Sequence, residues 1–176
     1  LCMHPNTFLR SFWTMNLKPQ IFVAMSFDSA YNERFYDVIE PAIKTVKYNG
    51  TPMTAYRVDL AKTGDSILTD INDGIVHSRF ILADISTVGK DSKTGRPYRN
   101  ANVMYEVGIA LSARSPTDIL LVHDDKDPLL FDVSVIPHAQ IDFTDKEQAK
   151  TKLTGLIEDR LKEQNHAINS KIALAT

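Results

Sequence analysis

This chain has very little cysteine and no excess of charge of either sign. Its one cysteine, Cys2, excludes an intramolecular disulfide framework and a zinc site built from cysteines. The 20 lysines and arginines against 22 aspartates and glutamates give a net charge of -2, so no bulk field favours nucleic acid. No apolar run approaches the roughly 18 residues that a membrane-spanning helix needs. We therefore expect no nucleic acid and no membrane as partners, and the cytoplasm is the default location.

What remains is the composition of one ordinary globular domain. Its 176 residues are 43% hydrophobic and 24% charged, which is enough for a single sizeable core. Residues 1–14 show no periodicity, and we interpret them as a flexible tail or upstream extension, with Met15 as a natural start. The alternative is an arm whose aromatic side chains pack on a neighbouring subunit. The domain is expected over residues 15–164, followed by a C-terminal tail over 165–176.

Apolar runs alternate with helical patterns along this domain. Buried strands are predicted at Ile21–Met25, Met53–Val58, Phe80–Ile85, Ile119–His123 and Ala139–Phe143. Apolar residues recur at helical spacing over 35–46, 67–75, 100–113 and 149–161. Pro41 predicts a kink in the first helix, and Asn49-Gly50 its end. Residues 86–99 are predicted to form a long polar loop.

Strands that alternate with helices indicate parallel βαβ units. The fold class is therefore α/β, a flavodoxin-like three-layer domain with a five-stranded, mostly parallel sheet and strand order 2-1-3-4-5. Such sheets bind ligands outside the carboxyl ends of the first and third strands. The segments expected there are Ser26-Phe27-Asp28 and the stretch from Asp84 to Glu106.

Glu106 is the most informative residue of the chain because it interrupts an apolar helix. A carboxylate between Tyr105 and Val107 risks a desolvation cost of several kcal/mol if it is buried while charged. On a helical wheel it lies about 85° from the centre of the apolar stripe, at the border of the buried face. Glu106 is thus a candidate for chemistry, although a structural ion pair is an equal alternative.

Further candidates surround this helix. Asp84 closes the third strand and is the second catalytic candidate, although a strand-end aspartate often caps the next turn instead. The candidate ligand-binding residues are Ser26, Phe27, Asp28, Ser86, Arg99, Asn100, Asn102 and Tyr105. The loop over 86–99 carries four cationic residues and two glycines, which suits either a phosphate clamp or a solvated mobile loop.

No metal or cofactor is expected. His77, His123 and His138 show no metal-ligand spacing. The acidic run Asp124–Asp127 is interpreted as a solvated turn rather than a metal site.

The runs Phe80-Ile-Leu-Ala-Asp-Ile-Ser86 and Asn102-Val-Met-Tyr-Glu-Val-Gly-Ile-Ala110 resemble the nucleoside 2-deoxyribosyltransferase-like superfamily, which includes nucleotide N-glycoside hydrolases. The resemblance implies that Glu106 attacks the anomeric carbon and that Asp84 contacts ribose or base. Met25-Ser26 and Asn102-Val103 depart from the glycine-containing pairs usual in the transferases, which leaves the substrate open.

A second resemblance covers much of the same chain. Residues 21–28, 63–67 and 73–79 are similar to Toll/interleukin-1 receptor (TIR) domains, whose enzymatic members cleave NAD with a glutamate on the corresponding helix. The resemblances imply an N-glycosidase or ribosyltransferase acting on a (deoxy)nucleotide or NAD, expected as a homo-oligomer. The alternatives are a non-catalytic nucleotide-sensing or TIR-like assembly module, and a pure interaction scaffold.

Overall fold

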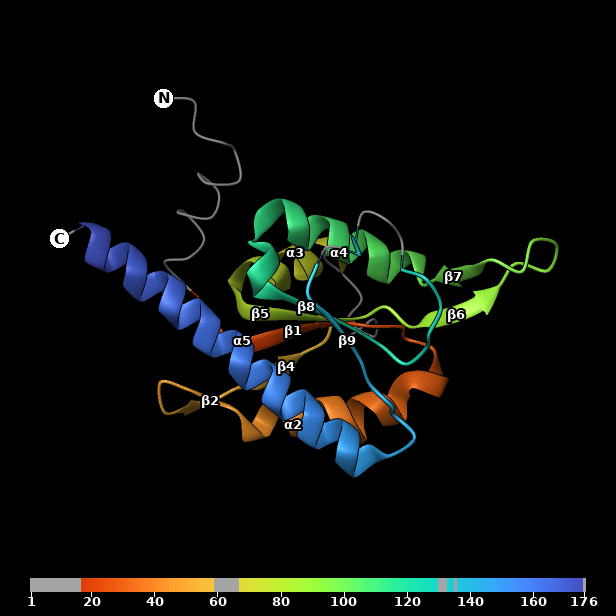
Figure 1. Cartoon of the computed structure of the whole chain (residues 1–176), viewed down its shortest axis with the longest axis horizontal. Helices are drawn as coiled ribbons and strands as arrows, with labels where there is room; N and C mark the ends of the chain where they lie inside the picture. Colours follow the sequence, from red (N-terminus) through yellow and green to blue (C-terminus); the bar gives the residue numbers. More distant parts are fainter. Residues whose placement is uncertain (1–16, 59–66, 130–132, 135, 176) are drawn as a thin grey trace, which may run out of the picture.

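Five parallel strands form the centre of the structure (Figure 1). They are β1 (Lys18–Ala24), β4 (Thr54–Tyr56), β5 (Ser78–Asp84), β8 (Ile119–His123) and β9 (His138–Gln140). Their order in the sheet is β4-β1-β5-β8-β9, and every neighbouring pair is parallel. Numbered along the chain, this is the order 2-1-3-4-5. The predicted flavodoxin-like α/β fold is confirmed.

The structure is a computed structural model that describes residues 17–58, 67–129, 133–134 and 136–175. The expected N-terminal tail over 1–14 and most of the TIR-like run 63–67 lie outside the described residues.

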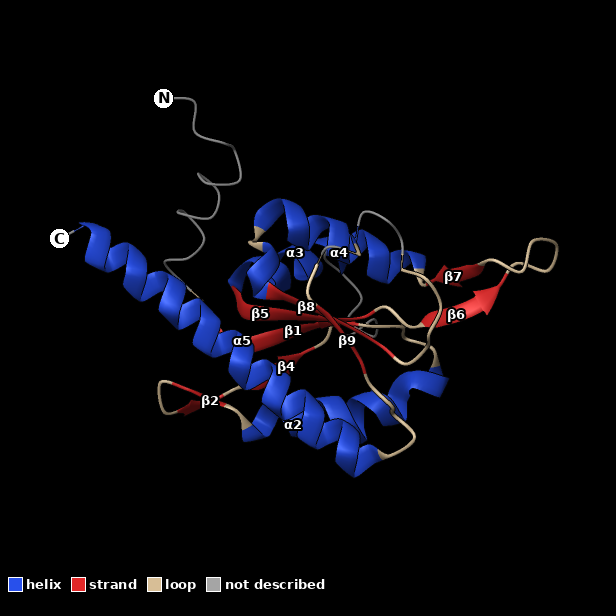
Figure 2. Ribbon diagram, viewed as in Figure 1, coloured by secondary structure: helices blue, strands red, loops and turns tan. Residues whose placement is uncertain are grey.

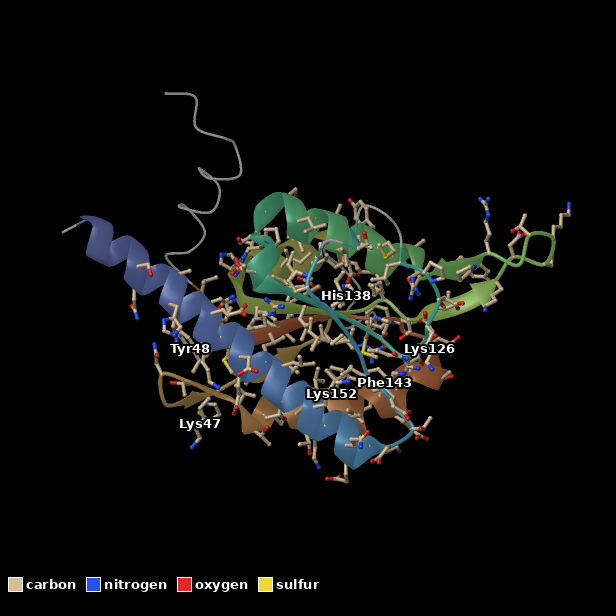
Figure 3. All side chains as sticks on the ribbon, viewed as in Figure 1. Lys47, Tyr48, Lys126, His138, Phe143 and Lys152 are labelled. Atoms are coloured by element: carbon tan, nitrogen blue, oxygen red, sulfur yellow. The ribbon has the colours of Figure 1, made fainter. Side chains whose placement is uncertain are left out.

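Helices cover both faces of the sheet, which gives three layers (Figure 2). One face carries α3 (Ile67–His77) and α4 (Ala101–Ala113). The other carries η3 (Arg34–Ile39), α2 (Glu40–Thr45) and α5 (Lys146–Ala175). Side chains fill the space between the sheet and both helical layers (Figure 3) and form two separate apolar cores.

Strand β5 shows why there are two cores. It is buried along its whole length, so side chains on both faces must be covered. Phe80 and Leu82 join the core beneath η3 and α5, whereas Ile81 and Ala83 join the core beneath α3 and α4. This is the alternation that a strand imposes on successive side chains.

The first helix contains the irregularity that Pro41 predicts. Residues Arg34–Ile39 are wound as a π-helix, and the Glu40 amide donates to the Phe35 carbonyl, five residues back. Pro41, which has no amide hydrogen to donate, lies in the first turn of α2. The predicted apolar face is buried throughout: Phe35, Val38, Ile39, Ala42, Ile43 and Val46.

Short elements connect these layers. They are η2 (Ser29–Tyr31), β2 (Lys47–Tyr48), β3 (Thr51–Pro52) and η4 (Pro116–Asp118). The helix α2 ends at Thr45, earlier than predicted, and Asn49-Gly50 instead forms the turn between β2 and β3. Both turn residues have positive φ, 49° and 80°, which an Asn-Gly pair tolerates and most residues do not.

Residues 86–99 correct the sequence prediction. The predicted loop is an antiparallel hairpin of β6 (Thr87–Lys90) and β7 (Pro97–Arg99), which projects beyond the sheet (Figure 1). These strands could not be recognised in the sequence because they are short and mostly polar, and so show no clear apolar pattern.

The last helix is also longer than predicted. Its inner face was expected to end near Leu161, yet α5 continues to Ala175, into the expected tail. None of the helices in the described ranges combines the length and hydropathy needed to cross a bilayer.

Candidate functional site

Helix α4 holds Glu106 against the core. The Asn100 side chain caps the helix by accepting hydrogen bonds from the Asn102 and Val103 amides, at 3.0 and 3.2 Å. Val103 and Val107 then pack onto the sheet. Glu106 lies on the same side of the helix and is only 7% exposed, deeper than the border position predicted from the wheel.

The Glu106 carboxylate has no compensating partner among the described residues. No hydrogen bond or ion pair reaches it from these parts of the chain, and desolvation by burial alone raises its pKa to about 7. Burying an unpaired carboxylate costs free energy of folding. Groups with strongly shifted pKa values also cluster at functional sites. Glu106 therefore remains the leading candidate for chemistry.

Asp84 has the opposite environment, since both of its oxygens are occupied. One oxygen accepts hydrogen bonds from the Ser86 amide at 3.0 Å and the Ser86 hydroxyl at 2.5 Å. The other accepts from Arg34 Nη1 at 2.9 Å. These contacts match the alternative of a strand-end aspartate that caps the following turn. Asp84 is thus a buried, fully paired anion.

Ser86 and Asp124 extend this pairing into a network between two strand ends and a helix. The Ser86 hydroxyl accepts from Arg34 Nη1 at 2.9 Å and from the Asp124 amide at 3.1 Å. Arg34 Nη2 donates to the Asp124 carboxylate, and the guanidinium lies 4.5 Å from the Phe143 ring centre. We call Arg34, Asp84, Ser86 and Asp124 the Arg34 network; it joins the ends of β5 and β8 to η3.

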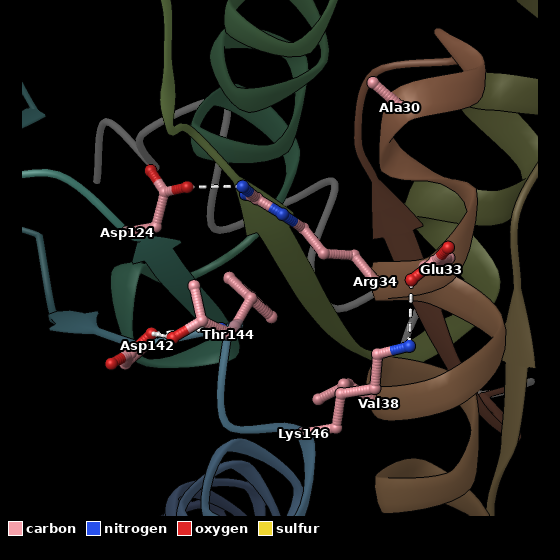
Figure 4. A pocket seen from close by; sticks show the side chains of 9 residues that line it. Ala30, Glu33, Arg34, Val38, Asp124, Asp142, Thr144 and Lys146 are labelled. Atoms are coloured by element: carbon pink, nitrogen blue, oxygen red, sulfur yellow. Dashed lines mark hydrogen bonds and ion pairs between the residues drawn. The ribbon is translucent and has the colours of Figure 1, made fainter.

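A pocket of about 280 Å³ lies beside the Arg34 network (Figure 4). It is lined by Ala30, Glu33, Arg34, Val38, Asp124, Asp142, Phe143, Thr144 and Lys146. The two cations that face it are already paired, because Arg34 contacts Asp84 and Asp124 while Lys146 Nζ contacts Glu33 at 2.8 Å and Asp37 at 2.7 Å. The pocket therefore offers an incoming anion no unpaired cation among the described residues.

The two catalytic candidates lie on opposite faces of the sheet. By the alternation along β5, Asp84 follows Leu82 onto the face covered by η3 and α5, where it meets Arg34. Glu106 belongs to α4, which packs on the other face. The structure consequently does not bring the two carboxylates together as a catalytic pair.

Arg99 makes contacts that hold neighbouring segments of the fold together. Its guanidinium makes a two-point contact with Asp125, at 3.0 and 3.2 Å, and also donates to the Ile85 carbonyl. Burial opposes the charge of Asp125, but hydrogen bonds from the Thr87 amide and Arg99 lower its pKa to about 2. Asp124 and Asp125 are thus anchoring groups. The run is a turn with Asp124 and Lys126 exposed, as predicted, but it also makes structural contacts that the sequence did not indicate.

The remaining predicted residues fall into two groups. Ser26 is buried, and its hydroxyl accepts from the Asp28 amide, while Asp28 caps η2 through the Ala30 amide. Phe27 and Tyr105 are 37% and 57% exposed. Asn102 is exposed on the outer side of α4. The first group therefore shapes the turn after β1, and the second group is open to solvent.

Sequence reasoning missed Arg34, Asp124 and Arg57. Arg34 occupies the polar side of a helix recognised by its apolar residues, and it lies 50 and 90 residues from Asp84 and Asp124. A lone arginine on the polar side of a helix carries no local signal of such a contact. No group of three or more acidic, histidine or cysteine side chains in the described ranges is placed to hold a metal ion.

Comparison with known proteins yields similarity in architecture alone. No family model matches the chain, and no curated protein matches its sequence. A 2-desoxiribosyltransferase from Leishmania mexicana is 17% identical, with a TM-score of 0.48 over 77% of this chain and 97% of that one. The flavodiiron core of Flv1 from Synechocystis sp. PCC6803 is 14% identical, with a TM-score of 0.49 over 88% of this chain and 38% of that one. Likenesses this distant do not bear on activity, and the strand order itself establishes a flavodoxin-like α/β fold.

Proposed function

We propose that this protein is an N-glycosidase or ribosyltransferase that cleaves the ribosyl C–N bond of a (deoxy)nucleotide or of NAD. The observation that carries the proposal is the state of Glu106: buried, without a partner among the described residues, and with a pKa raised to about 7. The resemblance of residues 102–110 to the nucleoside 2-deoxyribosyltransferase-like superfamily supports the same assignment.

The reaction gives such a carboxylate a role. Breaking the ribosyl C–N bond develops positive charge on the anomeric carbon and the ring oxygen. An ionised carboxylate beside that carbon either stabilises this charge or bonds to the carbon to form a glycosyl-enzyme. Water then releases the sugar in a hydrolase, and a second base accepts it in a transferase. Because Glu106 is desolvated, its attraction to the developing cation is stronger than it would be in water.

The position of α4 agrees with this role. The helix begins at Ala101, just after the hairpin that follows β5, so its first turns lie toward the carboxyl edge of the sheet. Open α/β sheets bind their ligands at that edge. Asp84 receives a positioning role in the proposal, because its oxygens are already used to hold Ser86 and Arg34.

A second candidate function is a nucleotide-sensing module without turnover. The separation of Asp84 and Glu106 on opposite sheet faces favours it, since a single carboxylate can recognise a ligand without a second catalytic group nearby. In this alternative Glu106 binds ligand and a change in the module's assembly reports it. A TIR-like assembly role belongs to the same alternative.

One incubation separates the two functions. The purified chain is mixed with nucleosides, nucleotides and NAD, and released bases are separated by chromatography. The catalytic proposal expects at least one base to be released at a rate proportional to protein concentration. A ligand-dependent rise in melting temperature without any released base would support the sensing module instead.

A further inference from the structure

A second pocket lies at the carboxyl edge of the sheet, beside the ends of β1 and β4. Its volume is about 470 Å³, within the range of small-molecule sites. It is lined by Phe27, Asn32, Phe35, Tyr36, Glu40, Ala55, Arg57 and Val58. We call this the β4 pocket; it shares no lining residue with the pocket beside the Arg34 network.

Arg57 is the group that gives the β4 pocket its chemistry. Its guanidinium lies over two aromatic rings, 4.7 Å from the centre of Phe27 and 5.1 Å from that of Phe35. One terminal nitrogen donates to the Ser26 carbonyl at 2.8 Å. Its Nε is buried and has no hydrogen-bond partner among the described residues. Arg57 is therefore held in place by contacts that leave its positive charge unneutralised.

The charge of Arg57 is also uncompensated. Four other arginines in the described ranges contact carboxylates: Arg34, Arg99, Arg114 and Arg160. Arg57 contacts none in those ranges, and burial lowers its pKa. The carboxylate of the pocket, Glu40, is itself paired with Lys44 at 2.9 Å. A partly desolvated cation in this position is stabilised by an anion that enters the pocket.

The aromatic residues indicate what the anion is attached to. Tyr36 is 59% exposed and Phe27 is 37% exposed, so two large rings face solvent beside the guanidinium. Exposed rings around a hollow bind flat apolar groups by stacking. Arg57 covers part of Phe27, so the exposed part of this ring and the more exposed Tyr36 are the surfaces left for a planar group.

We propose that the β4 pocket is a binding site for a planar aromatic ring that carries an anionic group, a phosphate or a carboxylate. The anion is bound by Arg57, and the ring packs against Tyr36 and Phe27. Asn32 adds an amide for polar ring atoms. This site is independent of the cleavage proposed for Glu106, because its lining residues come from η3, α2, β4 and the segment after β1 rather than from α4.

Calorimetric titrations with defined probes test the site. The probes are adenosine 5′-monophosphate, adenosine, inorganic phosphate and nicotinate. Arg57→Met should weaken binding of the monophosphate about 10- to 100-fold, the usual effect of losing a hydrogen bond to a charged group. Arg57→Lys should give an intermediate loss, because lysine keeps the charge but not the planar fork. Lys162→Met, which removes an exposed cation from α5, should change binding by less than about twofold.

Chemical-shift mapping keeps the test decisive if Arg57→Met unfolds. In the parent chain and in Glu106→Gln, the monophosphate should shift the amide signals of Asn32, Tyr36 and Ala55. Nicotinate binding as tightly as the monophosphate would support the site and identify a carboxylate as its anion. Adenosine binding as well as the monophosphate, inorganic phosphate alone binding as tightly, or shifts confined to other segments would each overturn the proposal. Loss of cleavage in Glu106→Gln with these shifts retained would separate this site from the proposed catalytic one.

Discussion

Arg34 Nη1 and Asp84 Oδ2 are 2.9 Å apart at the carboxyl end of β5, with the Asp84 side chain almost fully buried. The contact joins the π-helical segment to the central sheet. Since the same guanidinium also reaches Asp124, one arginine ties together three segments that end at this edge. The Arg34 network thus fixes the rim on the face opposite Glu106.

Exchanging each carboxylate for an amide should change stability in opposite directions. Asp84→Asn removes a buried negative charge that faces Arg34, so we expect a loss of about 3 kcal/mol in the free energy of unfolding. Glu106→Gln removes a desolvated charge without a described partner, so it should be neutral or stabilising above pH 7. Urea denaturation of both variants beside the parent at pH 8 measures the two signs. A loss for Glu106→Gln as large as that for Asp84→Asn would show that Glu106 is paired after all.

The stability of the parent should fall as pH rises from about 4.5 to about 7. Burial raises the pKa of Glu106 from 4.5 to about 7, so the folded chain binds more protons than the unfolded chain in this window. The stability contributed by the protonated group is present below pH 4.5 and is lost as pH passes the folded pKa. The difference is at most about 3 kcal/mol. Glu106→Gln should flatten this part of the profile, which denaturation at several pH values would detect.

The hairpin over residues 87–99 should depend on the pair of Arg99 and Asp125. A two-stranded hairpin is marginal by itself, and this pair anchors it to the segment after β8. Arg99→Met should therefore accelerate amide hydrogen exchange in the hairpin while leaving β5 protected. Unchanged exchange would show that the contact between Arg99 and Asp125 is dispensable for the hairpin.

The cationic residues of the hairpin predict that it responds to ligand. Addition of a nucleotide should then slow amide hydrogen exchange in residues 87–99.

Two glycine substitutions provide a matched test of packing. A Cβ on Gly74 would lie 2.5 Å from a Phe22 ring atom and 2.6 Å from a Tyr56 ring atom. Gly74→Ala should therefore destabilise the chain by about 1–3 kcal/mol, since α3 must move off the sheet. Gly155→Ala on α5 meets nothing within 4 Å and should instead add up to about 1 kcal/mol of stability. Melting curves of the two variants should move in opposite directions.

The central sheet could be predicted from sequence because its strands are locally encoded. Residues 21–25 and 80–83 are continuous apolar runs, and such runs are typical of strands that are buried on both faces of a sheet. Glu106 could be singled out because a charged residue within an apolar helical pattern can be recognised from the sequence alone. The depth at which Glu106 is buried could not be predicted, because the exposure of a residue near the edge of an apolar stripe depends on the elements packed beside it.

The Arg34 network and the β4 pocket could not be predicted in the same way. The network joins residues separated by up to 90 positions, and the spacing of polar side chains in a sequence does not indicate which of them will be in contact. Arg57 follows a short edge strand, so its place beside Phe27 and Phe35 depends on how η3 packs. The hairpin could not be recognised in the sequence because it has no apolar face of its own. It is stabilised instead by the contact of Arg99 with Asp125, which lies outside the hairpin.

The rate of glycosidic cleavage by Glu106→Gln, measured beside the parent, tests the account most directly. The substitution keeps the shape of the side chain and removes its charge, so we expect kcat/KM to fall by about 10²–10⁴-fold while the fold survives. The matched control, Glu158→Gln on the exposed side of α5, should retain the parent rate. In the parent, kcat/KM should rise with pH up to about 7 and then level off, because the reaction needs the ionised carboxylate. Cleavage by Glu106→Gln at the parent rate would contradict the proposed mechanism.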